Sequence, residues 1–187
     1  VPELEAAGAS HHTLDIGRKS LLTLRHVPAL RRLLQAVGAD IVHARSRLPA
    51  WLGWRALRGL PVDRRPRWVT TVHGLNSPSR YSAIMASGER VICVSRTVRD
   101  YVCHHYPQTR RETLRVIPRG IDPGDFPRSA HPDRAARASV AAQFPALSGS
   151  GPLLLLPGRG TRLKGHADAL ALLAALRAAG MDARPWM

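Results

Sequence analysis

The sequence has few of the features that identify several common protein classes. Its 2 cysteines, Cys93 and Cys103, have neither the spacing of a metal site nor the density of a disulfide-stabilised domain. Apolar runs of about 18 residues, which predict a transmembrane helix, are missing, and no signal-peptide pattern occurs in these residues. No pair of carboxylates suggests a hydrolase, and no cluster of His, Cys and Asp suggests a metal centre. We therefore expect reduced thiols, a cytoplasmic location, and neither a metal nor another cofactor.

Acidic residues and lysines are also scarce, whereas arginine is abundant. Lys and Arg together number 28 against 13 Asp and Glu, which gives a formal net charge of +15, and Lys19 and Lys164 are the only lysines. The arginines are spread through every segment without interleaved aromatics, so no nucleic-acid-binding module is recognisable and we expect no nucleic-acid partner. Two interpretations of the charge remain: the bias of a GC-rich coding sequence, or attraction to an anionic membrane surface.

Short apolar segments alternate with amphipathic segments along most of the chain. This alternation is typical of βα units, so we predict an α/β fold with a Rossmann-like parallel sheet. The strand at 153–156 is expected to lie outside that sheet and to begin a second Rossmann-like domain. The expected strands cover residues 11–16, 40–44, 67–72, 90–94, 114–117 and 153–156. The expected helices cover residues 21–37 (divided near Pro28), 49–59, 96–105, 133–144 and 165–179, with a short one at 81–86.

The segment 153–165 has the composition of a diphosphate-binding loop. Its four leucines, bounded by Pro and Gly, predict a buried strand covered on both faces. Glycines in the loop let backbone N–H groups approach an anion, and the following helix directs its positive end to the same place. Arg159 can bond two phosphate oxygens, and Lys164 supplies a compact charge. Leu163, at the third glycine position, excludes the dinucleotide fingerprint. The alternative is an ordinary strand-to-helix turn with solvated cations.

Five segments together resemble one enzyme family. The loop Gly158–Gly165 resembles the Gly-Arg-x-x-x-x-Lys-Gly loop of GT-B fold glycosyltransferases of family 4, which are retaining and use nucleotide-sugar donors. Arg119 departs from the family's usual asparagine, and Gly160 from the apolar residue that usually follows the loop arginine. Together the matches run from about residue 40 to 180, most of the chain. The four upstream segments that match family elements in the right order are Asp40–Ser46, Thr70–Gly74, Val91–Ser95 and Ile117–Asp122.

The resemblance implies roles for residues at strand ends, beyond which ligands bind in open parallel sheets. His73 is expected to contact the donor sugar as the catalytic histidine; the alternative is a rim histidine that only makes hydrogen bonds. Arg119 is either a third cation near the phosphates or a solvated arginine, and His43 is interpreted as structural or solvent-facing. The expected diphosphate contacts are Gly158, Arg159, Lys164 and Gly165; the donor or cleft contacts are Gly74, Ser95, Arg119 and Gly120; the acceptor-side residues are Arg45, Arg47 and Tyr81.

Domain organisation follows from the same resemblance. Residues 1–122 are expected to form an N-terminal glycosyltransferase domain that is incomplete at its start. Residues 123–151 form a linker rich in Pro, Asp, Arg, Ser and Gly, and 152–187 begin a C-terminal nucleotide-sugar-binding domain. The family's glycine-rich first loop and its Glu-x7-Glu segment are missing from these residues. We therefore expect the chain to be inactive on its own.

The sequence predicts a glycosyltransferase that moves a sugar from a nucleotide-diphosphate donor to a glycan or glycolipid acceptor with retention. The expected setting is bacterial surface polysaccharide or lipopolysaccharide synthesis, with peripheral association at the inner face of the cell membrane. By resemblance, the acceptor hydroxyl attacks from the leaving-group face and its proton passes to the departing phosphate, so no protein nucleophile is needed. The alternative is a non-catalytic fragment or module that binds an anionic glycolipid or a nucleotide.

Overall fold

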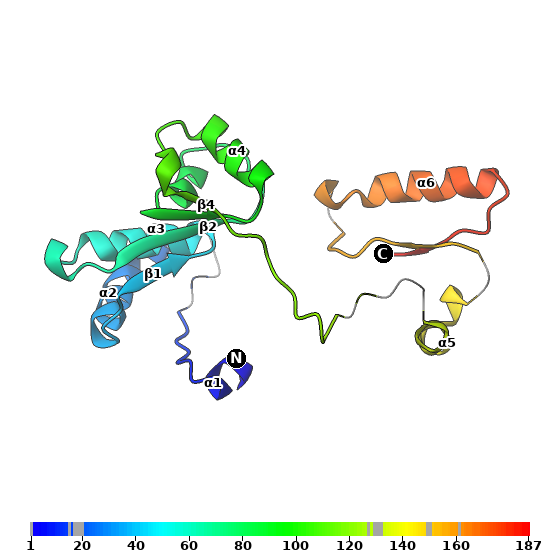
Figure 1. The fold of residues 1–187 in the computed structure, drawn as a ribbon, viewed down its shortest axis with the longest axis horizontal. Helices are drawn as coiled ribbons and strands as arrows, with labels where there is room; N and C mark the ends of the chain where they lie inside the picture. The colour runs from blue at the N-terminus through cyan, green and yellow to red at the C-terminus, as the bar shows by residue number, and fades with distance from the viewer. Residues whose placement is uncertain are drawn as a thin grey trace. The chain divides into compact units, whose positions relative to one another are not determined.

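A computed structural model describes residues 2–14, 16, 21–126, 128, 133–148, 151–160 and 162–187 (Figure 1). The chain divides into two compact units, Val1–Gly120 (unit 1) and Ile121–Met187 (unit 2). Unit 1 begins with a short helix, α1 (Pro2–Ala6). Of the strand expected at 11–16, residues 11–14 and 16 have no regular structure, and Asp15 lies outside the described residues.

Unit 1 is built around a parallel sheet of four strands, β1 (Ile41–Ala44), β2 (Arg67–Val72), β3 (Arg90–Cys93) and β4 (Leu114–Val116). The strands lie in the order β1-β2-β3-β4, and each neighbouring pair is parallel. This confirms the predicted parallel sheet. Because every strand runs the same way, the residues that follow the four strands lie along one edge of the sheet.

Helices connect the strands of unit 1 in the way that βα alternation predicts. Pro28 stands in the first turn of the main helix before β1, where its missing N–H costs no helical hydrogen bond. Ser95 ends the extended segment after β3, and its Oγ accepts a hydrogen bond from the Val98 N–H, which caps the next helix. The helical elements are η1 (Leu21–His26), α2 (Val27–Ala36), α3 (Arg47–Arg58), η2 (Val62–Arg64), η3 (Ser82–Ala86), α4 (Arg96–His105) and η4 (Arg111–Thr113).

The two faces of the four-strand sheet differ in burial. One face carries Trp68, Val72, Val91 and Cys93, which are all buried and pack with side chains of α3, η3 and α4 in the core. The other face, which we call the open face, is exposed or half-buried apart from Thr71. Its members, which alternate with the core residues along each strand, are Ile41, His43, Arg67, Val69, Thr71, Arg90, Ile92 and Arg115.

Unit 2 contains a separate parallel pair of strands, β5 (Leu153–Leu155) and β6 (Arg184–Trp186), joined through η6 (Arg162–Lys164) and α6 (His166–Ala178). The pair forms its own sheet, which confirms that the strand after Pro152 lies outside the first sheet. Together the elements confirm the predicted α/β fold class.

The predicted burial of β5 on both faces is wrong. Leu153 and Leu155 are exposed, the latter to 61%, and Leu154 is half-buried. The reason is that β5 pairs with β6 in a sheet of two strands, which cannot bury an apolar run as a wide sheet does. The apolar side of α6 is also only partly covered, because Leu173 is buried while Leu170 and Leu172 are about half exposed.

The segment predicted as a linker contains structure that packs on β6. It includes α5 (Arg134–Gln143), which Asp133 caps by accepting the Ala135 N–H, and the turn η5 (Pro145–Leu147). The buried Arg184 guanidinium donates to the carbonyl oxygens of Leu147 (2.7 Å) and Gly151 (2.5 Å). The first part of unit 2 is thereby attached to its sheet, while the assignment of 1–122, 123–151 and 152–187 to family domains stays a prediction.

Candidate functional site

The carboxyl edge of the four-strand sheet brings together four of the predicted site residues. Arg45 follows β1, His73 follows β2, Ser95 stands two residues beyond β3, and Arg119 stands three residues beyond β4. Arg45 and Arg119 are exposed, whereas His73 and Ser95 are half-buried. All four side chains carry N–H or O–H donors and none is a carboxylate, which suits a ligand with phosphate or hydroxyl oxygens.

His73 and Arg119 are in direct contact. Arg119 Nη2 lies 2.6 Å from His73 Nδ1, a hydrogen bond that joins the ends of two strands that are not neighbours. Burial lowers the pKa of His73 below its ordinary value of 6.5, and the charges of Arg119 and Arg45 and the neighbouring His43 lower it further. The imidazole is therefore held in its neutral form at neutral pH.

His43, interpreted from the sequence as structural or solvent-facing, is exposed and lies near enough to act on the His73 ring. Its Nε2 lies 2.6 Å from Thr71 Oγ1, across the β1–β2 pair on the open face. Partial burial and the Arg45 charge lower the pKa of His43. The signal that could have identified it is the period of two along β1, because His43 and Arg45 share a face and Arg45 was already a candidate.

The remaining predicted contacts of the donor or cleft are less specific. The Ser95 hydroxyl already accepts the helix-capping hydrogen bond from Val98, which uses one of its two acceptor lone pairs and leaves its O–H able to donate to a ligand. Gly74 directly follows His73, and Gly120 directly follows Arg119; at both positions a Cβ would meet open space. Their backbones are accessible, but no close packing in the described residues requires glycine there. Their proposed roles stay predictions.

Two of the predicted acceptor-side residues lie together at the start of α3. Arg47 Nη1 donates to Ser82 Oγ at 3.2 Å, and the Arg47 guanidinium lies over the Tyr81 ring at 5.4 Å from its centroid. Trp51 Nε1 donates to the Tyr81 carbonyl oxygen at 3.0 Å, which fixes the same segment from the helix side. The Arg47–Tyr81 pair forms a surface with a cation and an aromatic face, whereas Arg45 directly follows β1.

In unit 2 the predicted diphosphate residues lie on the loop between β5 and α6. Gly165 adopts a left-handed conformation with φ of 72° and ends the loop as the N-cap of α6. A Cβ at Gly158 would stand 3.4 Å from the Lys164 side chain, so the Lys164 stem passes directly over Gly158. Arg159 and Lys164 are exposed, and within the described residues neither has a hydrogen-bond or ion-pair partner. Thr161 lies outside the described residues.

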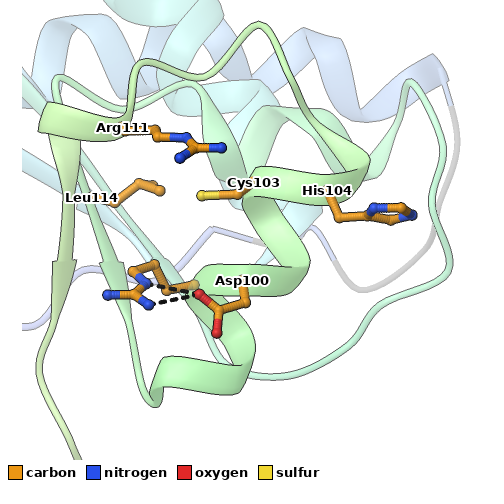
Figure 2. Close-up of a pocket in the computed structure, with 6 residues that line it drawn as sticks. Asp100, Cys103, His104, Arg111 and Leu114 are labelled. Carbon is orange, nitrogen blue, oxygen red and sulfur yellow. Dashed lines mark hydrogen bonds and ion pairs between the residues drawn. The ribbon is translucent and has the colours of Figure 1, made fainter.

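In unit 1, a hollow of about 780 Å³ lies between α4 and the start of β4 (Figure 2). Figure 2 shows Cys103 pointing toward Leu114 and His104 directed away. Arg99 and Asp100, which also line the hollow, form an ion pair at 2.7 Å. None of the predicted site residues lines this hollow. It is therefore not part of the site predicted from the sequence.

Neither a metal-binding cluster nor a membrane-spanning helix occurs among the described residues. Across this part of the chain no group of three His, Cys, Asp or Glu side chains is placed to hold a metal ion. Each helix in the described ranges falls short of the length and apolarity needed to span a bilayer. The predicted lack of a metal or cofactor stays a prediction.

Comparison with known proteins places this architecture. The fold is similar to the crystal structure of a glycosyltransferase from Rickettsia africae ESF-5, with a TM-score of 0.71 and 24% sequence identity. The likeness covers 98% of this chain and 48% of that one, so the chain spans about half the length of the solved protein. It agrees with the fold class found above, part of a GT-B fold. No curated protein matches the chain. Residues 5–125, more than half of the chain, match the model of Glycosyltransferase Family 4, and the chain therefore belongs to that family.

Proposed function

We propose that the chain handles the donor and acceptor of a retaining glycosyltransferase, which moves a sugar from a nucleotide diphosphate to a glycan or glycolipid. The observation that carries the proposal is the β5–α6 loop. Arg159 and Lys164 are exposed there and have no partner among the described residues, beside Gly158 and a helix N-terminus. A diphosphate offers the oxygens that such cations and backbone N–H groups bind.

The chemistry of transfer explains why two cations on a loop matter. As the glycosidic bond breaks, negative charge grows on the leaving diphosphate. Cations held in place stabilise that charge more in the transition state than in the bound donor, which lowers the barrier. The leaving phosphate then accepts the proton of the attacking hydroxyl, so the reaction requires no nucleophile from the protein. The proposal includes no metal or other cofactor.

Unit 1 supplies the sugar and acceptor contacts in this proposal. His73 contacts the donor sugar, Arg119 and the backbone at Gly74 and Gly120 support it, and the surface formed by Arg47 and Tyr81 meets the acceptor. The 2.6 Å contact of Arg119 with His73 and the Arg47–Tyr81 stacking support the assignment, because both place donors at the carboxyl edge of the sheet or beside it. Bacterial surface polysaccharide or lipopolysaccharide synthesis is the proposed setting.

Calorimetric titration of the chain with UDP, GDP and ADP tests the loop. Arg159→Ala and Lys164→Ala should each weaken binding of the preferred nucleotide by roughly 10- to 100-fold, the loss typical of a charge-assisted hydrogen bond. Arg137→Ala is the matched control, because Arg137 is an exposed arginine of α5 in the same unit. Equal losses in all three variants, recovered by lowering the salt, would contradict the proposal. Nucleotide binding without transfer of a labelled sugar in any complete enzyme carrying these residues favours a binding module.

A second surface of unit 1 supports peripheral association with an anionic membrane. Leu22 and Leu24 are exposed on η1. Leu24 also lines a hollow of about 460 Å³ together with Val27, Pro28, Arg31, Arg55, Arg58 and Gly59. Mixed apolar and basic side chains are what the interface of an anionic bilayer attracts. Sedimentation with phosphatidylglycerol vesicles should fall in a Leu22→Ala, Arg55→Ala double variant but not in Arg137→Ala. Equal binding to phosphatidylcholine vesicles would argue against an electrostatic contribution.

A further inference from the structure

We propose that Arg119 is a positioning residue: it holds the His73 ring in the neutral form with the proton on Nε2, so that His73 meets the donor as a hydrogen-bond donor. The identity of the ligand rests on the proposed function. The arrangement of the two side chains rests on unit 1 alone. Arginine at this position departs from the asparagine of the related motif, and this role gives the departure a physical purpose.

The hydrogen bond between Arg119 and His73 can have only one direction. Arg119 Nη2 lies 2.6 Å from His73 Nδ1. A guanidinium has only N–H donors and stays protonated in proteins, so Nδ1 has to accept with its lone pair. A neutral imidazole carries one proton, which is therefore assigned to Nε2 from the donor character of its partner. An Nδ1–H tautomer or an imidazolium would place two donors against each other.

The groups that surround the His73 ring also favour its neutral form. Arg119 faces His73 from the segment after β4, Arg45 from the segment after β1, and His43 from β1 itself. Among the described residues no carboxylate contributes to its titration. Burial, then Arg119, Arg45 and His43, all lower the His73 pKa from 6.5, so these groups and the hydrogen bond favour the same neutral ring.

The tautomer decides whether the His73 ring can donate or accept a proton in the site. With Nδ1 occupied by Arg119 and Nε2 protonated, neither nitrogen can take a proton from the acceptor hydroxyl while the contact lasts. His73 is instead a fixed donor toward a sugar hydroxyl or a phosphate oxygen. Arg119 does not need to touch the donor for this purpose, because it acts through the ring.

Nitrogen-15 NMR of the full chain, labelled at histidine, tests the tautomer without any ligand. His73→Gln identifies the resonances among the 9 histidines. The unsubstituted chain should show a neutral His73 at pH 7 with a bare Nδ1 and a protonated Nε2. Arg119→Ala should mix the two tautomers and raise the His73 pKa toward its ordinary value, and Arg119→Lys should restore the Nε2–H form in part. A charged His73, an Nδ1–H form, or an unchanged tautomer in Arg119→Ala would overturn the proposal.

Arg45→Ala is the matched control. Arg45 also lowers the His73 pKa but makes no hydrogen bond to Nδ1, so its removal should raise the pKa and leave the tautomer unchanged. A tautomer change of equal size in Arg45→Ala would contradict a specific role for Arg119. Adding the preferred nucleotide sugar should then shift the Nε2 resonance. If the Arg119 effect is seen and no nucleotide sugar binds, the positioning role stands and the proposed function fails.

Discussion

The two units start from similar sequence patterns but differ in what they bury. Unit 1 joins four strands and packs one face of its sheet into a continuous core that includes Trp68, Val91 and Cys93. In the described residues of unit 2, by contrast, Leu173, Ala183 and Arg184 are the buried ones. A run of four leucines is therefore no guarantee of burial. The difference shows that neighbouring strands and helices, more than the hydrophobicity of one strand, decide how much apolar surface a βα unit removes from water.

The rate of backbone hydrogen exchange should show the largest difference between the two units. Backbone amides of β2 and β3 should exchange more slowly than those of β5 and β6 by roughly 100-fold or more, because local opening of a two-strand sheet exposes little buried surface. The Leu156 N–H, bonded to Trp186 O at 2.9 Å, and the Arg184 N–H, bonded to Pro152 O at 3.0 Å, report on unit 2. Exchange measured by NMR checks the ratio, and similar protection in both sheets would break the comparison.

Truncating one leucine in each unit tests the same difference energetically. Leu57 on α3 is 3% exposed and belongs to the core, whereas Leu155 on β5 is 61% exposed. Leu57→Ala should lower the free energy of unfolding of unit 1 by about 2–5 kcal/mol through lost burial and a cavity. Leu155→Ala should lower the free energy of unfolding of unit 2 by less than about 1 kcal/mol, because the Leu155 side chain buries little apolar area. Urea unfolding followed by the fluorescence of the buried Trp68 measures the first, and exchange at β5 the second. Comparable costs would mean that β5 is packed in solution.

A backbone substitution in the phosphate loop should have a smaller effect. Gly165 has φ of 72°, and an alanine there should destabilise unit 2 by about 1–2 kcal/mol through left-handed strain. Gly160→Ala is the control: a Cβ meets open space, so the change should stay within about 0.5 kcal/mol. Thermal unfolding followed by circular dichroism compares them. Should both variants unfold alike, the loop conformation in solution is not the one described.

The smallest expected effect is the pH dependence of one contact in unit 1. The Glu89 carboxylate accepts the Trp68 N–H at 3.1 Å and Arg67 Nη1 at 2.9 Å, and these bonds, the first most strongly, lower the Glu89 pKa from 4.5. A lowered pKa in the folded state stabilises unit 1 above pH 4.5, and this contribution is lost as the pH falls through the folded value. Because the pair is exposed, the difference between Glu89 and Glu89→Gln should be below about 1 kcal/mol. The two urea midpoints should converge in acid; a gap that persists there would rule out the carboxylate.

Much of the site in unit 1 was predictable because parallel strands end at one edge. The order of βα units alone placed Arg45, His73 and Ser95 along that edge. The hydrogen bond from Arg119 to His73 was not predictable, because it depends on the course of the chain after β4 and on two rotamers. The contact of His43 with Thr71 was not predictable either, because Thr71 becomes a neighbour only once the register of β1 and β2 is known.

The fold itself was predictable to the extent that local patterns determine it. The positions of β1 to β5 and the separation of β5 from the first sheet follow from alternation and from the composition of the intervening residues, whereas the strand predicted at 11–16 is not formed by residues 11–14 and 16. Burial on β5 and α6 could not be predicted, because period-based arguments assume that a partner covers each apolar face. Leu172 illustrates this: it belongs to an apolar helix but remains about half exposed.

The open face of the four-strand sheet makes self-association of this chain depend on the salt concentration. Ile41, Val69 and Ile92 lie on it among Arg67, Arg90 and Arg115, while the whole chain carries a formal charge of +15. Repulsion between like-charged molecules keeps such faces apart, but its range shrinks from about 10 Å at 0.1 M salt to about 3 Å at 1 M. Added salt should therefore drive self-association, seen as earlier elution in size-exclusion chromatography. At low salt, the repulsion caused by the arginine excess keeps the chains from associating.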